Sequence, residues 1–143
     1  MFTVLFDMAE LAALLPEKYR DEIEKYHSAV FTVSQMNEVT NDLDEYDRDM
    51  AGKAMAILEP PSIDHRIVNQ YSFFSVVPNG MDDIEKFLDK YTQNTYKYII
   101  SKDIRWELRD ILDQLNISER IVYPGLDGLT KWIGRHYYVK EKK

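Results

Sequence analysis

Three side chains that could do chemistry, His65, Arg66 and Gln70, fall within one predicted helix at residues 63–71. Arg66 and Gln70 are four residues apart, so they share a helix face. Arginine presents a rigid planar fork that suits a carboxylate or a phosphate, and a neighbouring histidine can act as a general base. Two interpretations of Arg66 stay open: a clamp for a ligand, or a structural tie from this helix to the carboxyl-terminal turn.

Asp127 is the fourth candidate, and it follows a Pro-Gly turn at residues 124–125 that precedes a predicted helix at 126–138. At the start of that helix its carboxylate can accept backbone N–H donors. It can also pair with Arg66, which would make both residues structural. In the catalytic alternative, Asp127 and the three side chains of the earlier helix form a concave site.

The most acidic part of the chain, residues 37–50, holds six carboxylates against one arginine. Its apolar residues recur at helical spacing, which predicts a single amphipathic helix with the acids on its outer face. That face is either a solvated surface or an acidic docking surface. Under the second interpretation, the candidate partner-binding carboxylates are Asp42, Asp44, Glu45 and Asp47.

Aromatic side chains point to a second kind of contact, because ten tyrosines and two tryptophans exceed what a small core needs. Tyr and Trp offer large, rigid contact area with a polar tip. The predicted helix at 103–115 carries one apolar stripe, and Trp106 lies off it. We therefore predict that Trp106 is an exposed anchor for a protein partner; the alternative is a core filled with amphipathic aromatics.

Most catalytic and metal-binding motifs are absent from the sequence. There is no phosphate-binding glycine loop and no Gly-x-Ser-x-Gly nucleophile motif. The three histidines lie on separate predicted elements without ligand spacing, and there is no cysteine, so we predict no metal site. Asp42 and Asp44 lack the glycine and the following ligands of a calcium loop. We predict no cofactor.

A net charge of −7 limits the class of partner. Proteins that grip nucleic acid neutralise phosphates with a basic face, so we predict no direct nucleic-acid binding. No apolar run approaches the ~20 residues that span a membrane, and acids at positions 7 and 10 interrupt any signal-peptide pattern. With no cysteine, these features predict a cytoplasmic protein off the membrane whose protein partner is basic or itself binds nucleic acid.

A chain of 143 residues is long enough to bury a core, and we predict a single domain over residues 1–143 with a frayed tail at 139–143. Residue patterns predict about five short strands and about six helices, intermixed along the chain. The fold class is therefore α+β or α/β, with the helices packed on one sheet. A first strand at a sheet edge would permit a homodimer. The predicted strands are residues 2–6, 29–33, 54–59, 73–77 and 95–100.

Two blocks resemble a known family. The first runs from residues 57–60 (Ile-Leu-Glu-Pro) through an Arg-Ile pair at Arg66 and the Gln four residues later to Phe74. The second is the amphipathic helix, Pro-Gly turn and Leu-Asp-Gly-Leu of residues 112–129. Both are similar to the carboxyl-terminal part of the FRG-domain family, named for a Phe-Arg-Gly motif. The resemblance covers residues 54–138.

The departures from that family concern its amino-terminal half. The chain has no Phe-Arg-Gly or Tyr-Arg-Gly, and no His-Gly-x-Pro-Thr…Asp-Trp motif, which together build the family's pocket. Ser72 stands where the family has a glycine, and Gly125 where it commonly has an aspartate. The resemblance therefore implies FRG-like ancestry without the residues that name the family.

We expect a non-catalytic protein-interaction module that binds through acidic and aromatic surface. FRG-like domains occur in bacteria and their phages, so the resemblance implies a phage or mobile-element protein that modulates or inhibits a bacterial defence protein. The alternative is an enzyme or enzyme subunit, transferase-like, that binds a nucleotide-type ligand near Arg66 and Gln70.

Overall fold

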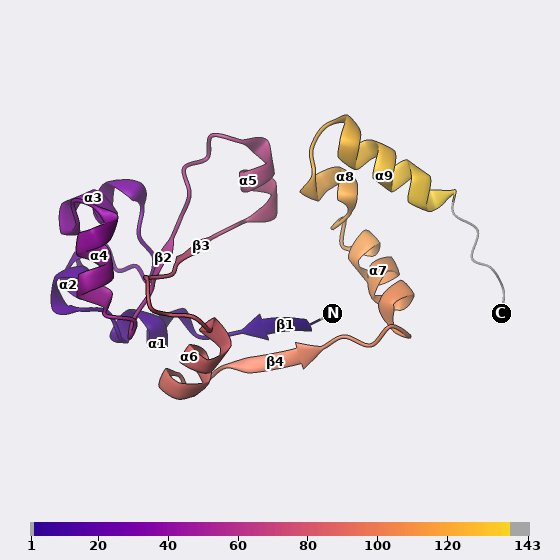
Figure 1. Ribbon diagram of the computed structural model, residues 1–143. Helices are drawn as coiled ribbons and strands as arrows, with labels where there is room; N and C mark the ends of the chain where they lie inside the picture. The colour runs from indigo at the N-terminus through magenta and orange to yellow at the C-terminus, as the bar shows by residue number, and fades with distance from the viewer. Residues whose placement is uncertain (1, 138–143) are drawn as a thin grey trace. The chain divides into compact units, whose positions relative to one another are not determined.

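The computed structural model describes residues 2–137, and this part of the chain forms two compact units (Figure 1). The N unit comprises Phe2–Pro61 and Phe73–Ile99. The C unit comprises Ser62–Ser72 and the described chain from Ile100 onward. One domain over residues 1–143 stays a prediction, and the predicted frayed tail at 139–143 lies outside the described residues.

The N unit contains both helices and strands. Antiparallel pairing joins its strands two by two, β1 with β4 and β2 with β3, in two separate sheets. In chain order its elements are β1 (Phe2–Leu5), α1 (Met8–Ala13), α2 (Glu17–Lys25), α3 (Val33–Val39), α4 (Leu43–Met50), β2 (Ala56–Leu58), β3 (Phe74–Val76), α6 (Ile84–Tyr91) and β4 (Tyr96–Ile99).

All the regular secondary structure in the described residues of the C unit is helical. Its elements are α5 (His65–Gln70), α7 (Arg105–Gln114), α8 (Glu119–Val122) and α9 (Leu126–His136).

The predicted sheet of five strands covered by six helices is wrong. Residues 2–137 contain four strands in two two-stranded sheets and nine helices, so the fold is α+β without a common sheet. Strand positions were read from β-branched and aromatic runs, which do not specify pairing partners. Four of the predicted strands form, each shortened at one or both ends, and the strand at 29–33 does not.

A helix cap explains the missing strand. Thr32 opens α3 with a capping box, in which its hydroxyl accepts from the Gln35 amide at 3.3 Å and its own amide donates to Gln35 Oε1 at 2.7 Å. This cap ends the extended segment one residue after Phe31. Phe31 keeps only an isolated parallel bridge to Leu58.

A second cap divides the predicted acidic helix at 37–50 into α3 and α4. Thr40 is extended, with φ of −148° and ψ of 140°, and therefore ends α3. Asp42 then opens α4, since its Oδ1 accepts from the Glu45 amide at 2.7 Å. The helical spacing of the apolar residues was correct, but it bridges a break of three residues between the helices.

Two apolar clusters form the core of the N unit. In the first, the buried Tyr19 ring lies edge-to-face against both Phe31 and Tyr46, with ring centroids 6.1 Å apart in each pair. The second gathers buried side chains from α1, β2 and α6 around Leu11, Ile57 and Phe87. Each such side chain contributes about 1.5–3 kcal/mol on burial, so these clusters dominate the stability of the unit.

Close backbone approach packs α8 against α9 in the C unit. A Cβ added at the buried Gly128 would overlap the Tyr123 carbonyl and crowd the Glu119 carbonyl, so only glycine fits there. Gly125, with φ of 103°, supplies the turn that reverses the chain before α9. The predicted Pro-Gly turn is confirmed, and the short helix α8 lies between α7 and this turn.

The C unit has little apolar burial. Among its described residues only Ser118 and Gly128 are buried, and neither carries an apolar side chain of any size. Instead, ion pairs join its helices: Arg135 of α9 contacts Asp113 of α7 at 2.6 Å and Glu119 of α8 at 3.1 Å. The contrast with the two clusters of the N unit shows that the described core is concentrated there.

Candidate functional site

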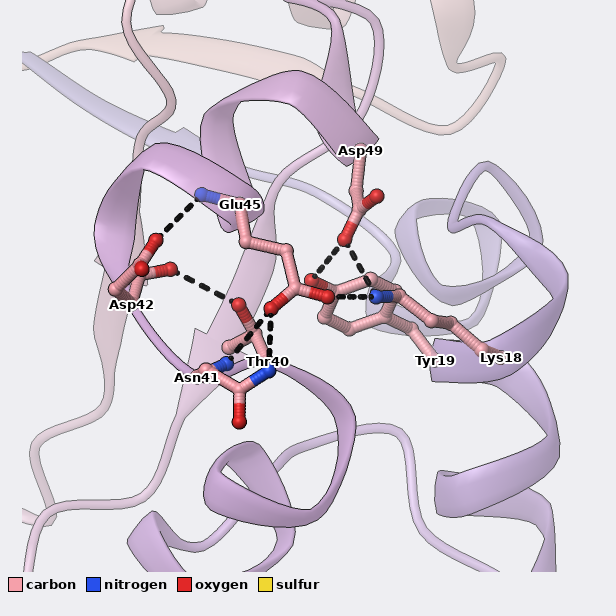
Figure 2. A network of polar contacts seen from close by, with 7 residues as sticks. All are labelled: Lys18, Tyr19, Thr40, Asn41, Asp42, Glu45 and Asp49. Carbon is pink, nitrogen blue, oxygen red and sulfur yellow. Dashed lines mark hydrogen bonds and ion pairs between the residues drawn. The ribbon is translucent and has the colours of Figure 1, made fainter.

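The amino terminus of α4 is the centre of a polar network (Figure 2). Glu45 Oε2 accepts from both the backbone amide and the side-chain amide of Asn41, at 3.0 and 2.8 Å. Its other oxygen, Oε1, accepts from Lys18 Nζ of α2 at 2.9 Å. Thr40 donates its hydroxyl to the Asp42 carbonyl at 2.9 Å, which closes the loop between α3 and α4.

Asp49 extends the network one helical turn further (Figure 2). Its Oδ2 accepts from the Tyr19 hydroxyl at 2.9 Å and forms an ion pair with Lys18 at 2.7 Å. Lys18 therefore bridges two carboxylates that are four residues apart on α4. The result is a charged link between α2 and α4 that contacts the hydroxyl of Tyr19 in the first apolar cluster.

The network shifts the pKa values of its members. Donation by the Asn41 backbone amide, followed by the Lys18 contact, lowers the pKa of Glu45 to about 2. Burial raises the pKa of the Tyr19 hydroxyl to about 12. The hydrogen bond to Asp49, followed by that to Glu45, raises the pKa of Lys18. At neutral pH the Glu45 carboxylate and the Lys18 ammonium are therefore charged, and the Tyr19 hydroxyl is neutral.

Three of the four predicted docking carboxylates serve the fold. Asp42 caps α4, Glu45 holds Asn41 and Lys18, and Asp47 Oδ1 accepts from the Asn79 amide at 2.8 Å. Asp44 differs, because it is exposed and makes no hydrogen bond or ion pair with any residue from 2 to 137. The sequence signal for these roles was the spacing of an N-cap residue and a Glu or Gln three positions later.

A shallow groove of about 250 Å³ lies beside this network. Its apolar lining comes from both acidic helices and both strands of the β2–β3 sheet, and Leu43 on its rim is 73% exposed. The sequence did not reveal this groove, because Leu58 and Val76 lie far from the acidic stretch along the chain. Its lining residues are Val33, Met36, Asn37, Thr40, Asn41, Asp42, Leu43, Tyr46, Leu58 and Val76.

Charge is divided unequally between the two units. The N unit carries 17 acidic residues against 8 basic ones, so it accounts for more than the whole net charge of −7. Exposed carboxylates at Glu38 of α3 and Asp44 of α4 stand on the two helices that line the groove. The groove is therefore an apolar strip within a negatively charged unit.

The residues of the predicted His65 site take mainly structural positions. Gln70 donates to the Val122 carbonyl at 3.2 Å, and the neighbouring Asn69 donates to the Ile121 carbonyl at 2.9 Å, which ties α5 to α8. Arg66 is exposed and its guanidinium lies 5.0 Å from the centre of the Tyr123 ring.

The other two members of that site are also exposed. His65 begins α5, and Asp127 lies in the first turn of α9 without capping it. No ion pair joins Arg66 to Asp127 within the described chain. Of the two interpretations of Arg66, the geometry thus favours the structural one. The side-chain amides of Asn69 and Gln70 and the Arg66 guanidinium hold α5 against α8 and Tyr123.

Trp106 lies in the C unit and is half-buried. The Arg109 guanidinium lies 5.7 Å from the centre of its ring, and Arg109 also contacts Glu119 at 2.8 Å. Together with Lys131, Gly134 and Arg135, these residues line an open hollow of about 610 Å³. Its arginines are already paired with carboxylates, so the hollow has little uncompensated positive charge.

Residues 2–137 hold neither a metal-binding cluster nor a helix that could span a membrane. No cluster of three or more metal-binding side chains occurs there, and none of the helices is long and apolar enough to cross a membrane. No protein-family model matches the chain, and neither does any curated protein or solved structure. Any role of the groove on α3 and α4 therefore follows from its geometry and charge alone.

Proposed function

We propose that the protein is a non-catalytic interaction module that binds a basic protein segment on the acidic N unit. The observation that carries the proposal is the apolar groove between α3, α4 and the β2–β3 sheet, set in a unit with 17 acidic and 8 basic residues. Apolar contacts supply affinity in such an interface, and complementary charge speeds encounter and selects the partner.

The carboxylates of α3 and α4 divide into two classes under this proposal. Asp42, Glu45 and Asp47 shape the site from within, because the fold uses their oxygens. Asp44 and Glu38 are exposed and make no polar bond within residues 2–137, so they are the carboxylates that meet the partner. A lysine or arginine of the partner pairs with them while its apolar side chains occupy the groove.

The biological setting is part of the same proposal. Residues 54–138 resemble the carboxyl-terminal half of FRG-like domains, which are found in bacteria and phages. A phage or mobile-element protein that inhibits a bacterial defence protein is the concrete form we favour, with the acidic surface facing a basic or nucleic-acid-binding face of the target. We place the protein in the cytoplasm, because disulfides are rare in that reducing compartment and this chain has no cysteine.

The test compares two variants with the same change in net charge. Glu38→Lys with Asp44→Lys reverses one exposed acid on each of the two helices that line the groove, whereas Asp82→Lys with Asp89→Lys reverses two exposed acids in and before α6. Tagged protein captures partners from its native host, and mass spectrometry quantifies them. We expect a stoichiometric basic partner that the α6 control retains and the groove variant loses at least tenfold.

Two results would contradict the proposal. One is equal recovery of the partner by the groove variant and the control variant, with both folded by circular dichroism. The other is recovery of a companion chain that bears the missing Phe-Arg-Gly half, which would support a split enzyme instead.

A further inference from the structure

The β1–β4 ribbon of the N unit has two unpaired edges. Its two strands pair only with one another, from Phe2 opposite Ile99 to Leu5 opposite Tyr96. In an antiparallel pair, alternate backbone N–H and C=O groups of each strand point away from its neighbour. No other backbone hydrogen bond involves the strand Phe2–Leu5 within residues 2–137. The outer edge of β1 is therefore a row of free donors and acceptors.

The two faces of the ribbon differ. Val4 packs on the second core cluster, and Lys97 opposite it forms an ion pair with Glu85 of α6 at 2.6 Å, so this face meets the N unit. The other face carries Thr3, Leu5, Tyr96 and Tyr98. On this face Leu5 and the two tyrosines are 53–58% exposed.

The edge of β1 lacks the usual protection against pairing. Natural edge strands carry charged residues, prolines or bulges that prevent another strand from adding on. The four residues Phe-Thr-Val-Leu include none of these, whereas β4 carries Lys97 in its centre. Of the two edges of the ribbon, β1 is thus the one open to a further strand.

A second copy of the chain supplies a matching strand, because its own β1 has the same unprotected edge. The charge of the ribbon permits this approach. The N unit is strongly acidic, so most of its surface repels an identical unit. The ribbon contains no carboxylate in either strand. It is a neutral-to-positive strip on which two copies can meet without opposing acids.

We propose that two copies of the protein pair antiparallel along β1 and form a four-stranded sheet. A two-fold axis perpendicular to the sheet joins the same edge of each copy and leaves no unprotected β1 edge. Two-stranded ribbons are marginal on their own, and four strands fall in the usual range for sheets. The faces with Tyr96 and Tyr98 then join into one surface, with tyrosines on both outer strands and Thr3 and Leu5 of the two β1 strands between them.

The absence of cysteine makes a direct test possible. Thr3→Cys places a thiol beside the two-fold axis, and Tyr98→Cys places one on the cross-strand neighbour of Thr3, one strand further from the axis. Under mild oxidation at dilute concentration, we expect Thr3→Cys to form a disulfide-linked dimer at least tenfold faster than Tyr98→Cys. Equal rates for the two variants would overturn the pairing.

Sedimentation velocity of the full chain supplies the second measurement. We expect a dimer for the wild type, a monomer for Thr3→Lys, and a dimer for the matched Tyr98→Lys. A monomeric wild type at its highest soluble concentration would overturn the proposal. A dimer that survives Thr3→Lys would also overturn it. The inference stands apart from the proposed partner, because neither variant changes the groove on α3 and α4.

Discussion

The Tyr46 hydroxyl connects α4 to both strands of the β2–β3 sheet. It donates to the Val76 carbonyl at 2.5 Å and accepts from the buried Ala56 amide at 3.0 Å. Tyr46→Phe removes both bonds and leaves a buried N–H without a partner, so we expect the free energy of unfolding to fall by about 2 kcal/mol. Urea unfolding measures this loss. Tyr98→Phe, on the exposed face of β4, is the control and changes little.

Glu45 predicts a pH dependence of stability. Its pKa is lowered from 4.5 to about 2 in the folded protein, so the unfolded chain binds more protons between those values. The Glu45 contribution is therefore complete above pH 4.5 and is lost as the pH falls toward 2. Glu45→Gln lacks this contribution at every pH. We expect its stability deficit in urea to shrink as the pH falls from about 4.5 to about 2; a deficit independent of pH would contradict the assignment.

The sequence patterns predicted the roles of individual site residues less well than the positions of helices. The spacing in 37–50 correctly placed Tyr46 and Met50 on the buried face of α4. It did not show that Asp42 and Glu45 make hydrogen bonds at the start of α4. Residue type alone does not distinguish a solvated carboxylate from one that accepts hydrogen bonds at a helix start. The three-residue spacing of Asp42 and Glu45 was the available signal.

At the scale of elements, the packing of α8 on α9 depends on one glycine. Gly128→Ala forces the added Cβ against the backbone carbonyls of Tyr123 and Glu119, so the two helices must separate. Overpacking of this kind costs about 1–3 kcal/mol. Gly134→Ala in the same helix meets no atom within 4 Å, and we expect it to stabilise the protein by about 0.5–1 kcal/mol.

Thermal unfolding of the two variants, followed by circular dichroism, measures the difference. Gly128→Ala should melt well below the wild type and Gly134→Ala slightly above it. Equal melting temperatures for the two variants would show that α8 and α9 do not pack as the structure describes.

Helix starts were predictable where a polar cap precedes an apolar pattern. Asp7 before α1 is such a cap, since its side chain accepts from the Ala9 amide at 2.8 Å. Strand pairing was not predictable, because short apolar runs do not carry information about their neighbours. The segment at 29–33 shows the limit, because the helix cap at Thr32 lies within it and ends the extended conformation after Phe31.

For the whole molecule, the net charge of −7 is a sum that hides the difference between an acidic N unit and a much less charged C unit. The sequence correctly predicted a strongly acidic stretch, and the excursion Ser62–Ser72, which joins the C unit, carries one acid and one base and so does not change the division of charge. The groove does depend on that long-range connection, because β3 follows the excursion. The connection could not be read from local patterns.

The capping and bridging carboxylates of α4 have a consequence for comparing relatives. Selection for folding alone would preserve Asp42, Glu45 and Asp47, because each oxygen that they contribute holds a helix or a loop in place. Their retention in a divergent sequence would therefore report common ancestry. Covariation of the exposed Glu38 and Asp44 with charges on another protein would be the trace of a shared partner.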